Sequence, residues 1–200
     1  MPDMSTHPTQ PIRLIVGLGN PGADYAATRH NAGFWFLDHL AEKYGVTFKV
    51  DSKFHGQVAR ILVGGRECWL LKPSTFMNRS GQSVSSIAKY YKIPLDQILV
   101  AHDELDMAPG IARLKFGGGH AGHNGLRDIV SAMGSKDFWR LRIGIDHPGS
   151  AAQVVNYVLG RPSKQEAEAI ERLLDDCKRV LPELLKGEFQ RAMNRLHVVS

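Results

Sequence analysis

The stretch IRLIVGLGNPG, residues 12–22, decides the fold prediction, because a short, mostly apolar segment runs directly into a glycine-rich turn. Residues 12–16 combine β-branched and other apolar side chains, which is typical of a buried strand. From about His30 to Tyr44, apolar residues recur at three- and four-residue spacing, and Gly45 follows where a helix cap belongs. A strand, a turn and a helix in this order predict an α/β fold.

The rest of the chain continues to interleave strands with helices. Two segments, 56–63 and 67–71, flank Gly64-Gly65 and predict a hairpin. Because a hairpin is antiparallel, we expect a single domain with a mixed, mostly parallel twisted sheet flanked by helices. The further elements expected are strands at 98–102, 111–116 and 139–145 and helices near 84–91, 124–133 and 163–185.

Two local patterns refine this expectation. Ser163 and Glu166 have the spacing of a capping box at the start of the last helix, and Pro182 should kink that helix. In residues 139–145, Arg140 and Arg142 alternate with apolar side chains, which predicts a half-buried strand.

Length and composition narrow the class of protein. The 200 residues, 43% of them hydrophobic and 22% charged, fit one globular domain. Residues 1–11 are polar and contain three prolines, so we expect a disordered leader rather than a signal peptide, followed by one catalytic domain over 12–197. No apolar run approaches the ~20 residues of a membrane span. Two cysteines, Cys68 and Cys177, favour a reducing compartment over a disulfide framework.

The formal net charge of +5 is modest, but its distribution is uneven. Six cations fall within residues 111–142, against Asp128 and Asp137. Such a surplus could face a polyanion, or it could be a solvated face with no partner. The six are Arg113, Lys115, Arg127, Lys136, Arg140 and Arg142.

Two patterns that suggest a bound cofactor are weak. Gly17, Gly19 and Gly22 match the dinucleotide fingerprint, but that fingerprint needs a helix opening at its third glycine, and here the helical period begins only near His30. A metal site could be assembled from loop histidines, although solvated or hydrogen-bonded histidines are the commoner outcome. The residues considered for it are His102, Asp103, His120, His123 and His147.

A third group converges from several loops. Asn20, Asn78 and Asn124 lie beside predicted strand ends or helix starts, where open α/β sheets form their crevices. Asparagine can donate to an oxygen that gains charge without competing for the proton. His30 at a helix start could take a proton from water, and Asp103 after a strand could fix its tautomer. This pattern favours hydrolysis by direct attack of water, since no serine elbow is present.

Six motifs in order resemble bacterial-type peptidyl-tRNA hydrolase over about residues 12–195. Each is weak alone, but six in register are highly specific. They are VGLGNPG (16–22), TRHNAGF (28–34), KPSTFMNRSG (72–81), HDELD (102–106), GGGHAGHNGL (117–126) and RLRIGIDHPG (140–149).

The resemblance implies a cytoplasmic, monomeric esterase that needs no metal or other cofactor and no protein partner or membrane. Its substrate would be peptidyl-tRNA released prematurely from ribosomes, so that the tRNA is recycled for translation. By resemblance, His30 is the catalytic base, Asp103 holds it in its basic form, and Asn20 distinguishes an acylated from a free amino group.

The resemblance also implies the residues that contact substrate. Tyr25, Phe76, Asn78 and Asn124 would meet the tRNA end and the peptide backbone, with Met77 lining the same cleft. Lys115 and Arg142 would hold the phosphate at the tRNA 5′ end, a grip without base readout. A nucleic-acid-binding module without catalysis and a metallohydrolase remain the alternatives, which a His30 variant and a chelator would separate.

Overall fold

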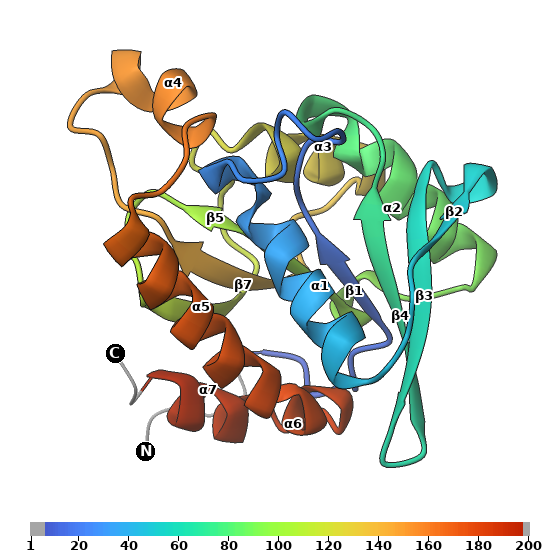
Figure 1. Cartoon of the computed structure of the whole chain (residues 1–200). Coiled ribbons are helices and arrows are strands. Elements are labelled where there is room, and N and C mark those ends of the chain that lie inside the picture. Colours follow the sequence, from blue (N-terminus) through green and yellow to red (C-terminus); the bar gives the residue numbers. More distant parts are fainter. Residues whose placement is uncertain (1–6, 198–200) are drawn as a thin grey trace.

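The computed structural model describes residues 7–197, and within them one mixed sheet of seven strands runs in the order β2-β3-β4-β1-β5-β7-β6 (Figure 1). The central strands β4, β1, β5 and β7 are parallel, whereas β2-β3-β4 and β7-β6 pair antiparallel. The expected mixed α/β sheet is therefore confirmed. The strands are β1 (Leu14–Gly17), β2 (Lys49–Asp51), β3 (Gly56–Val63), β4 (Arg66–Pro73), β5 (Ile98–Glu104), β6 (Ala112–Phe116) and β7 (Trp139–Gly144).

Helices cover both faces of the sheet (Figure 1). α1 and α5 pack on one face, with α6 and α7 at its lower end, whereas α2 and α3 pack on the other face. The helices are α1 (Ala32–Lys43), α2 (Ser80–Tyr90), α3 (Asn124–Met133), α4 (Val154–Val158), α5 (Lys164–Arg179), α6 (Leu181–Leu185) and α7 (Phe189–His197). Within residues 7–197, none is both long and apolar enough to cross a membrane.

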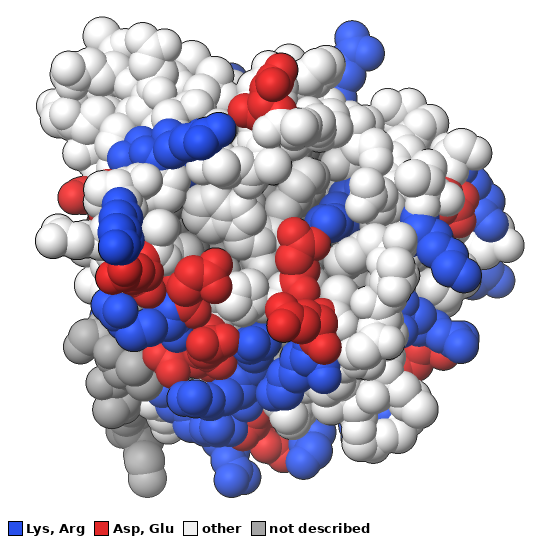
Figure 2. All heavy atoms as spheres, in the orientation of Figure 1, with Lys and Arg blue, Asp and Glu red and all other residues white. Residues whose placement is uncertain are grey.

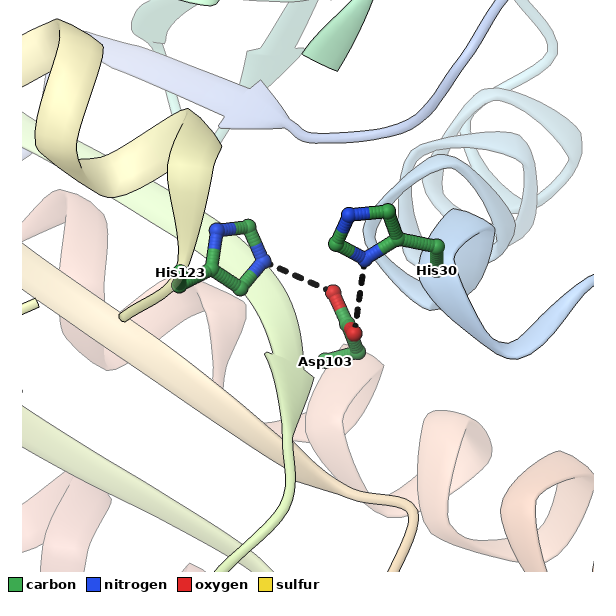
Figure 3. A group of neighbouring side chains, drawn as sticks. All are labelled: His30, Asp103 and His123. Atoms are coloured by element: carbon green, nitrogen blue, oxygen red, sulfur yellow. Dashed lines mark hydrogen bonds and ion pairs between the residues drawn. The ribbon is translucent and has the colours of Figure 1, made fainter. Parts of the chain in front are cut away.

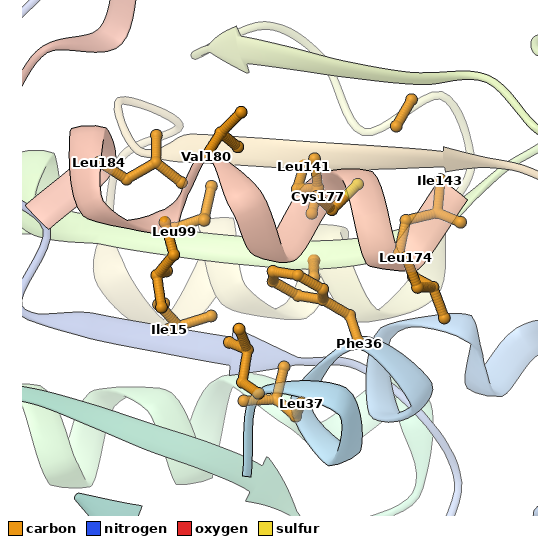
Figure 4. Packing of buried hydrophobic residues seen from close by; sticks show 14 of the residues in the cluster. Ile15, Phe36, Leu37, Leu99, Leu141, Ile143, Leu174, Cys177, Val180 and Leu184 are labelled. Carbon is orange, nitrogen blue, oxygen red and sulfur yellow. The ribbon is translucent and has the colours of Figure 1, made fainter. Parts of the chain in front are cut away.

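The first strand divides the apolar side chains between two cores. Ile15 points to the face covered by α1 and α5, where it joins Phe36 (Figure 4). Leu14 and Val16 point to the opposite face and join the core beneath α2 and α3. Successive side chains of a strand alternate between faces, and burying each large apolar side chain contributes roughly 1.5–3 kcal/mol. Both cores therefore fix the position of β1, from which the glycine-rich turn emerges.

Several sequence expectations are confirmed in detail. Gly64 and Gly65 both have positive φ, 56° and 78°, as a two-residue hairpin turn requires. Ser163 and Glu166 form the expected capping box on α5. The helix breaks near Pro182, with α5 ending at Arg179 and α6 beginning at Leu181. Cys68 and Cys177 are buried free thiols.

Two expectations about the strands need correction. β5 does not end at His102 but continues through Asp103 and Glu104, because the parallel ladder with β7 extends to those residues. The strand at Arg140 is not half-buried: the Arg140 side chain is only 2% exposed. Alternation fails here because β7 lies between β5 and β6 and is covered on both faces. The elements not expected from sequence are β2, α4 and α7.

Part of the expected leader lies against the C-terminal helices. Residues 1–6 lie outside the described residues. The ring of His7 lies 6.2 Å from that of Phe189 on α7 and 5.0 Å from that of Trp139 on β7, and the carbonyl of Thr9 lies against Gly187. Ile12 then donates its backbone N–H to Leu184, at 3.1 Å, immediately before β1 begins.

Candidate active site

A cavity of about 600 Å³ opens at the carboxyl ends of the parallel strands. It gathers residues that lie far apart in the sequence, including all three asparagines expected to converge. This is the crevice position expected for an open α/β sheet. Of the predicted site residues, those lining it are Asn20, His30, Phe76, Met77, Asn78, Asp103 and Asn124.

Two imidazoles converge on one buried carboxylate inside this cavity (Figure 3). Asp103 Oδ2 lies 2.9 Å from His30 Nδ1, and its Oδ1 lies 2.8 Å from His123 Nε2. Asp103 is 4% exposed, so hydrogen bonds from these two rings, rather than from water, stabilise its charge. His30 comes from the short 3₁₀ helix η1 (Arg29–Asn31), Asp103 from β5, and His123 from the N-cap of α3.

The hydrogen bonds of His123 fix which ring nitrogens carry protons. Its Nδ1 accepts from the backbone N–H groups of Gly125 and Leu126, at 3.2 and 3.3 Å. The proton of neutral His123 therefore sits on Nε2, which donates to Asp103. His123 was not predicted as a catalytic-site residue, and only its place among the weak metal candidates drew attention to it.

The same carboxylate sets the form of His30. Although burial opposes ionisation, the rings of His30 and His123 hold the pKa of Asp103 well below its usual range. Asp103 is thus an acceptor, and His30 must donate Nδ1–H to it. Burial alone would lower the pKa of His30, but the charge of Asp103 and this hydrogen bond raise it above the ordinary value. His30 Nε2 keeps its lone pair and points away from Asp103 (Figure 3).

Close packing at the start of α1 places His30 over β5. A Cβ on Gly33 would overlap the carbonyl of Ala101 and the backbone of Leu18, so only glycine permits this approach. Asn31, 1% exposed, exchanges two hydrogen bonds of 2.9 Å with the backbone of Asn20. Asn31 therefore ties the glycine-rich turn to η1, a role that sequence reasoning missed although the residue adjoins His30.

Asn20 is held from a second side as well. Its Oδ1 accepts from the backbone N–H of Met77 at 2.8 Å, and the side chain is nearly buried. An amide oxygen has two lone pairs, so one remains, together with both donors of the amide nitrogen. The turn after β1 and the short helix η3 (Met77–Arg79), which carries Asn78, are thereby joined across the cavity.

One wall of the cavity is apolar and comes from the α4 region. Figure 2 shows that the surface around α4 carries few charges, whereas both signs intermingle over the lower part of this face. Arg29, next to His30, secures this wall: it donates to the carbonyl of Tyr157 at 3.1 Å and pairs with Glu166 at 3.3 Å. The apolar residues of this cavity wall are Val154, Val155, Val158 and Leu159, together with Leu105.

The remaining predicted residues lie beside the cavity rather than in its lining. Tyr25 packs edge-on against Phe76, with ring centroids 6.4 Å apart. Lys115 and Arg142 line a neighbouring pocket of about 280 Å³. In it, Arg142 Nε donates to Glu104 at 2.8 Å, a carboxylate that was not predicted as a site residue.

His30, Asp103 and His123 could also be considered as a metal site, since their ligand atoms lie within 4.8 Å of one another. Only Asp103 and His123 of the set considered from sequence belong to this group. Both imidazole protons that face Asp103 would have to leave before a cation could bind. The donor set therefore suits a hydrogen-bonded array.

His102 also lines the cavity, but it is not a second base, because burial lowers its pKa to about 3.

The dinucleotide fingerprint is not completed by a helix. Gly22 has a φ of 101° and is followed by turns, and α1 opens only at Ala32. Gly17 and Gly19 instead permit the close approach of this segment to α1, since an added Cβ would overlap Gly33 or Phe34.

Comparison with known proteins agrees with this geometry. The sequence model of the peptidyl-tRNA hydrolase family matches residues 14–200. The chain belongs to the peptidyl-tRNA hydrolase family. Proteins described as peptidyl-tRNA hydrolase from Methylobacillus flagellatus and Chromohalobacter salexigens are each 56% identical to it, over 93% of this chain and 96% of theirs. The crystal structure of peptidyl-tRNA hydrolase from Acinetobacter baumannii matches with a TM-score of 0.92 and 52% identity, over 94% of this chain and 96% of that one.

Membership in the peptidyl-tRNA hydrolase family confirms the resemblance drawn from the six motifs, together with the hydrolase class. The same fold in the Acinetobacter baumannii structure confirms the α/β architecture.

Proposed function

We propose that this protein hydrolyses the ester bond between the peptide and the 3′ end of peptidyl-tRNA, with His30 as general base and water as the nucleophile. The observation that carries the proposal is the 2.9 Å hydrogen bond between His30 Nδ1 and Asp103 in the cavity of a peptidyl-tRNA hydrolase family member. It leaves His30 Nε2 able to take a proton. We further propose a monomer that acts in the cytoplasm without a metal or other cofactor.

The proposed reaction transfers one proton through His30. Nε2 removes a proton from water while the oxygen of that water attacks the ester carbonyl carbon. The bond from this carbon to the ribose oxygen then breaks, and the ribose oxygen takes the proton back from His30. Asp103 stabilises the imidazolium between these steps without itself being protonated. The products are a tRNA with a free 3′ hydroxyl and a peptide with a carboxylic acid, which releases its proton to solvent and becomes a carboxylate.

Water is the nucleophile in this proposal because no serine or cysteine of the described residues lines the cavity. Ser80 is buried and donates its hydroxyl to the carbonyl of Met77 at 2.7 Å. The negative charge of the tetrahedral intermediate would be met by the amides of Asn78 and Asn124 or by backbone N–H groups. Each donor of this kind typically contributes about 10²–10³ in kcat.

Asn20 would select the acylated substrate. The lone pair of its Oδ1 that Met77 does not use can accept from the N–H of an amide, whereas a free ammonium changes both charge and geometry. Asn78 and Asn124, together with Tyr25 and Phe76, would contact the tRNA end and the peptide backbone, and Met77 would line the same cleft. The apolar wall of α4 would face the peptide.

The test of the proposal is release of N-acetylated amino acid from N-acetyl-aminoacyl-tRNA by the purified protein. We expect turnover of this substrate, slow or no turnover of the same aminoacyl-tRNA with a free amino group, and unchanged rates in EDTA. Equal rates on both substrates would refute selection by Asn20. Loss of activity in EDTA, reversed by added metal, would instead support the metallohydrolase alternative.

The proposed binding of the tRNA 5′ phosphate by Lys115 and Arg142 gives a second prediction. Lys115→Ala and Arg142→Ala should raise KM several-fold and each reduce the slope of log KM against log salt by about one phosphate contact, with little change in kcat. We expect Lys115→Ala to have the larger effect, because the charge of Arg142 is partly compensated by Glu104 at 2.8 Å. Steady-state kinetics at several salt concentrations would measure both quantities.

A charge-matched control separates a contact from a general loss of positive charge. Arg191 on α7 is a surface cation whose side chain is 72% exposed. Arg191→Ala should leave the salt slope unchanged. An equal loss of slope in this control would remove Lys115 and Arg142 from the tRNA-binding surface.

A further inference from the structure

Four cations lie on one face of the β6-β7 pair, as two pairs of directly opposed residues. Lys115 lies opposite Arg140 in the strand register, and Arg113 lies opposite Arg142. Directly opposed residues project to the same side, and like charges so placed destabilise a sheet. Of the four, Lys115, Arg140 and Arg142 line the smaller pocket, together with the carboxylates of Glu104 and Asp106.

Arg140 differs from the other three because it is buried. Its Nη1 donates to the carbonyl of Gly119 at 2.6 Å and its Nη2 to that of Lys136 at 3.2 Å. The guanidinium carbon lies 4.4 Å from the ring centre of Phe138. Burial lowers the pKa of Arg140 to about 10, so it stays charged at neutral pH. Among the described residues, Glu104 is the carboxylate of this pocket that forms an ion pair. Its partner is Arg142, not Arg140.

Burying a cation whose hydrogen bonds go only to carbonyl groups carries a desolvation penalty. An apolar side chain of similar size would pack against Phe138 without that cost. What Arg140 does and an apolar side chain cannot do is hold two carbonyl groups, one of which belongs to the glycine-rich loop.

That loop, residues 117–123, connects the smaller pocket with the catalytic cavity. His120 and Ala121 line both. At one end the Lys115 side chain folds over Gly118, where an added Cβ would lie 2.6 Å from its Nζ. At the other end His123 donates to Asp103 at 2.8 Å. One loop therefore touches both the phosphate-binding lysine and the hydrogen-bonded array of the base.

The loop needs an anchor because its own sequence gives it little stiffness. Gly117, Gly118 and Gly122 have positive φ, and Ala121 has a φ of 48°, which costs a non-glycine residue energy. Glycine-rich segments lose more conformational entropy on ordering than others. The bond from Arg140 to Gly119 constrains the loop between its two functional ends.

We propose that Arg140 is a positioning residue that couples 5′-phosphate binding to the catalytic array by holding loop 117–123. The inference rests on the proposed function, in that Lys115 and Arg142 receive the phosphate. With the loop held, Lys115 is presented to the phosphate and His123 to Asp103 in the same arrangement. Without it, the phosphate improves catalysis less, although Arg142 and the rest of the cavity remain.

The experiment compares two forms of one substrate, N-acetyl-aminoacyl-tRNA with a 5′ phosphate or with a 5′ hydroxyl. For the wild-type protein the phosphorylated form should have a kcat/KM at least about tenfold higher, the size of one hydrogen bond to a charged group. In Arg140→Met this ratio should fall several-fold, as in Lys115→Ala. Unlike Lys115→Ala, Arg140→Met should also lower kcat on the phosphorylated substrate, because His123 is released together with the loop.

Arg113→Met is the matched control, since Arg113 lies on the same face of the sheet but does not line the pocket. It should keep the wild-type ratio. Arg140→Lys serves as the second variant if Arg140→Met does not fold: it keeps the charge but cannot bridge Gly119 and Lys136, so the ratio should still fall at an unchanged Tm. A folded Arg140→Met or Arg140→Lys protein with the wild-type ratio overturns the proposal. A wild-type ratio near one would instead refute the phosphate grip itself.

Discussion

Replacing His30 with alanine is expected to lower kcat for peptide release on the order of 10²–10⁴-fold, the usual contribution of a positioned general base. In the folded protein His30 donates to Asp103 through Nδ1, which leaves Nε2 as the basic atom in the cavity. Alanine removes that atom but none of the amides of Asn20, Asn78 and Asn124. Binding of N-acetyl-aminoacyl-tRNA should therefore stay within a few-fold of wild type.

Single-turnover kinetics together with a filter-binding Kd would separate these two effects. His39→Ala is the matched control, because His39 of α1 pairs with Glu171 of α5 at 2.8 Å, outside the cavity. It should keep the wild-type kcat. Turnover by the His30 variant at a rate close to wild type would refute His30 as the base, and loss of binding without loss of kcat would favour a purely binding role.

The architecture could be predicted from sequence because its determinants are local. The strand and glycine-rich turn of residues 12–22, the Gly64-Gly65 hairpin and the Ser163 capping box each depend on residues close together in the chain. The short elements β2 and α4 could not, since three to five residues carry too little periodicity. The burial of Arg140 could not either, because alternation along a strand does not reveal that both faces will be covered.

The site was predictable to the extent that its residues stand in recognisable motifs. His30, Asp103 and the three asparagines were named on chemistry and resemblance, and the cavity brings all of them together. His123 and Asn31 were missed because their roles are contacts across the fold. His123 shares Asp103 with His30, and Asn31 holds the backbone of Asn20. A sequence shows that such side chains are present, whereas only the fold shows what they bond.

The shared carboxylate leads to the second large effect, which Asp103→Asn should produce. His123 Nδ1 accepts two backbone N–H groups, so its Nε2 must continue to donate, and the oxygen of the substituted amide side chain would turn toward it. The nitrogen of that amide would then donate to His30 Nδ1. His30 would then carry its proton on Nε2, the atom that must accept a proton from water. We expect kcat to fall on the order of 10²–10⁴-fold even though the substitution is isosteric.

The residual activity of Asp103→Asn should also have a different pH dependence. His30 acts only when neutral, and in the wild-type protein Asp103 raises its pKa above the ordinary 6.5. Wild-type kcat/KM should therefore rise as the pH increases through a value above 6.5. Without the charge of Asp103, the pKa of His30 falls, and this acid limb should move to lower pH. Profiles of kcat/KM between about pH 5 and 9 would measure the shift.

Asp106→Asn is the control for charge, since it removes a carboxylate from the same HDELD motif at an exposed position. Solvent screens an exposed charge, so the acid limb should stay where it is in the wild-type protein. If both variants shifted the limb equally, the effect would be one of net charge near the cavity. If Asp103→Asn kept the wild-type kcat and limb, Asp103 would have no part in setting the tautomer and pKa of His30, and the array would be structural.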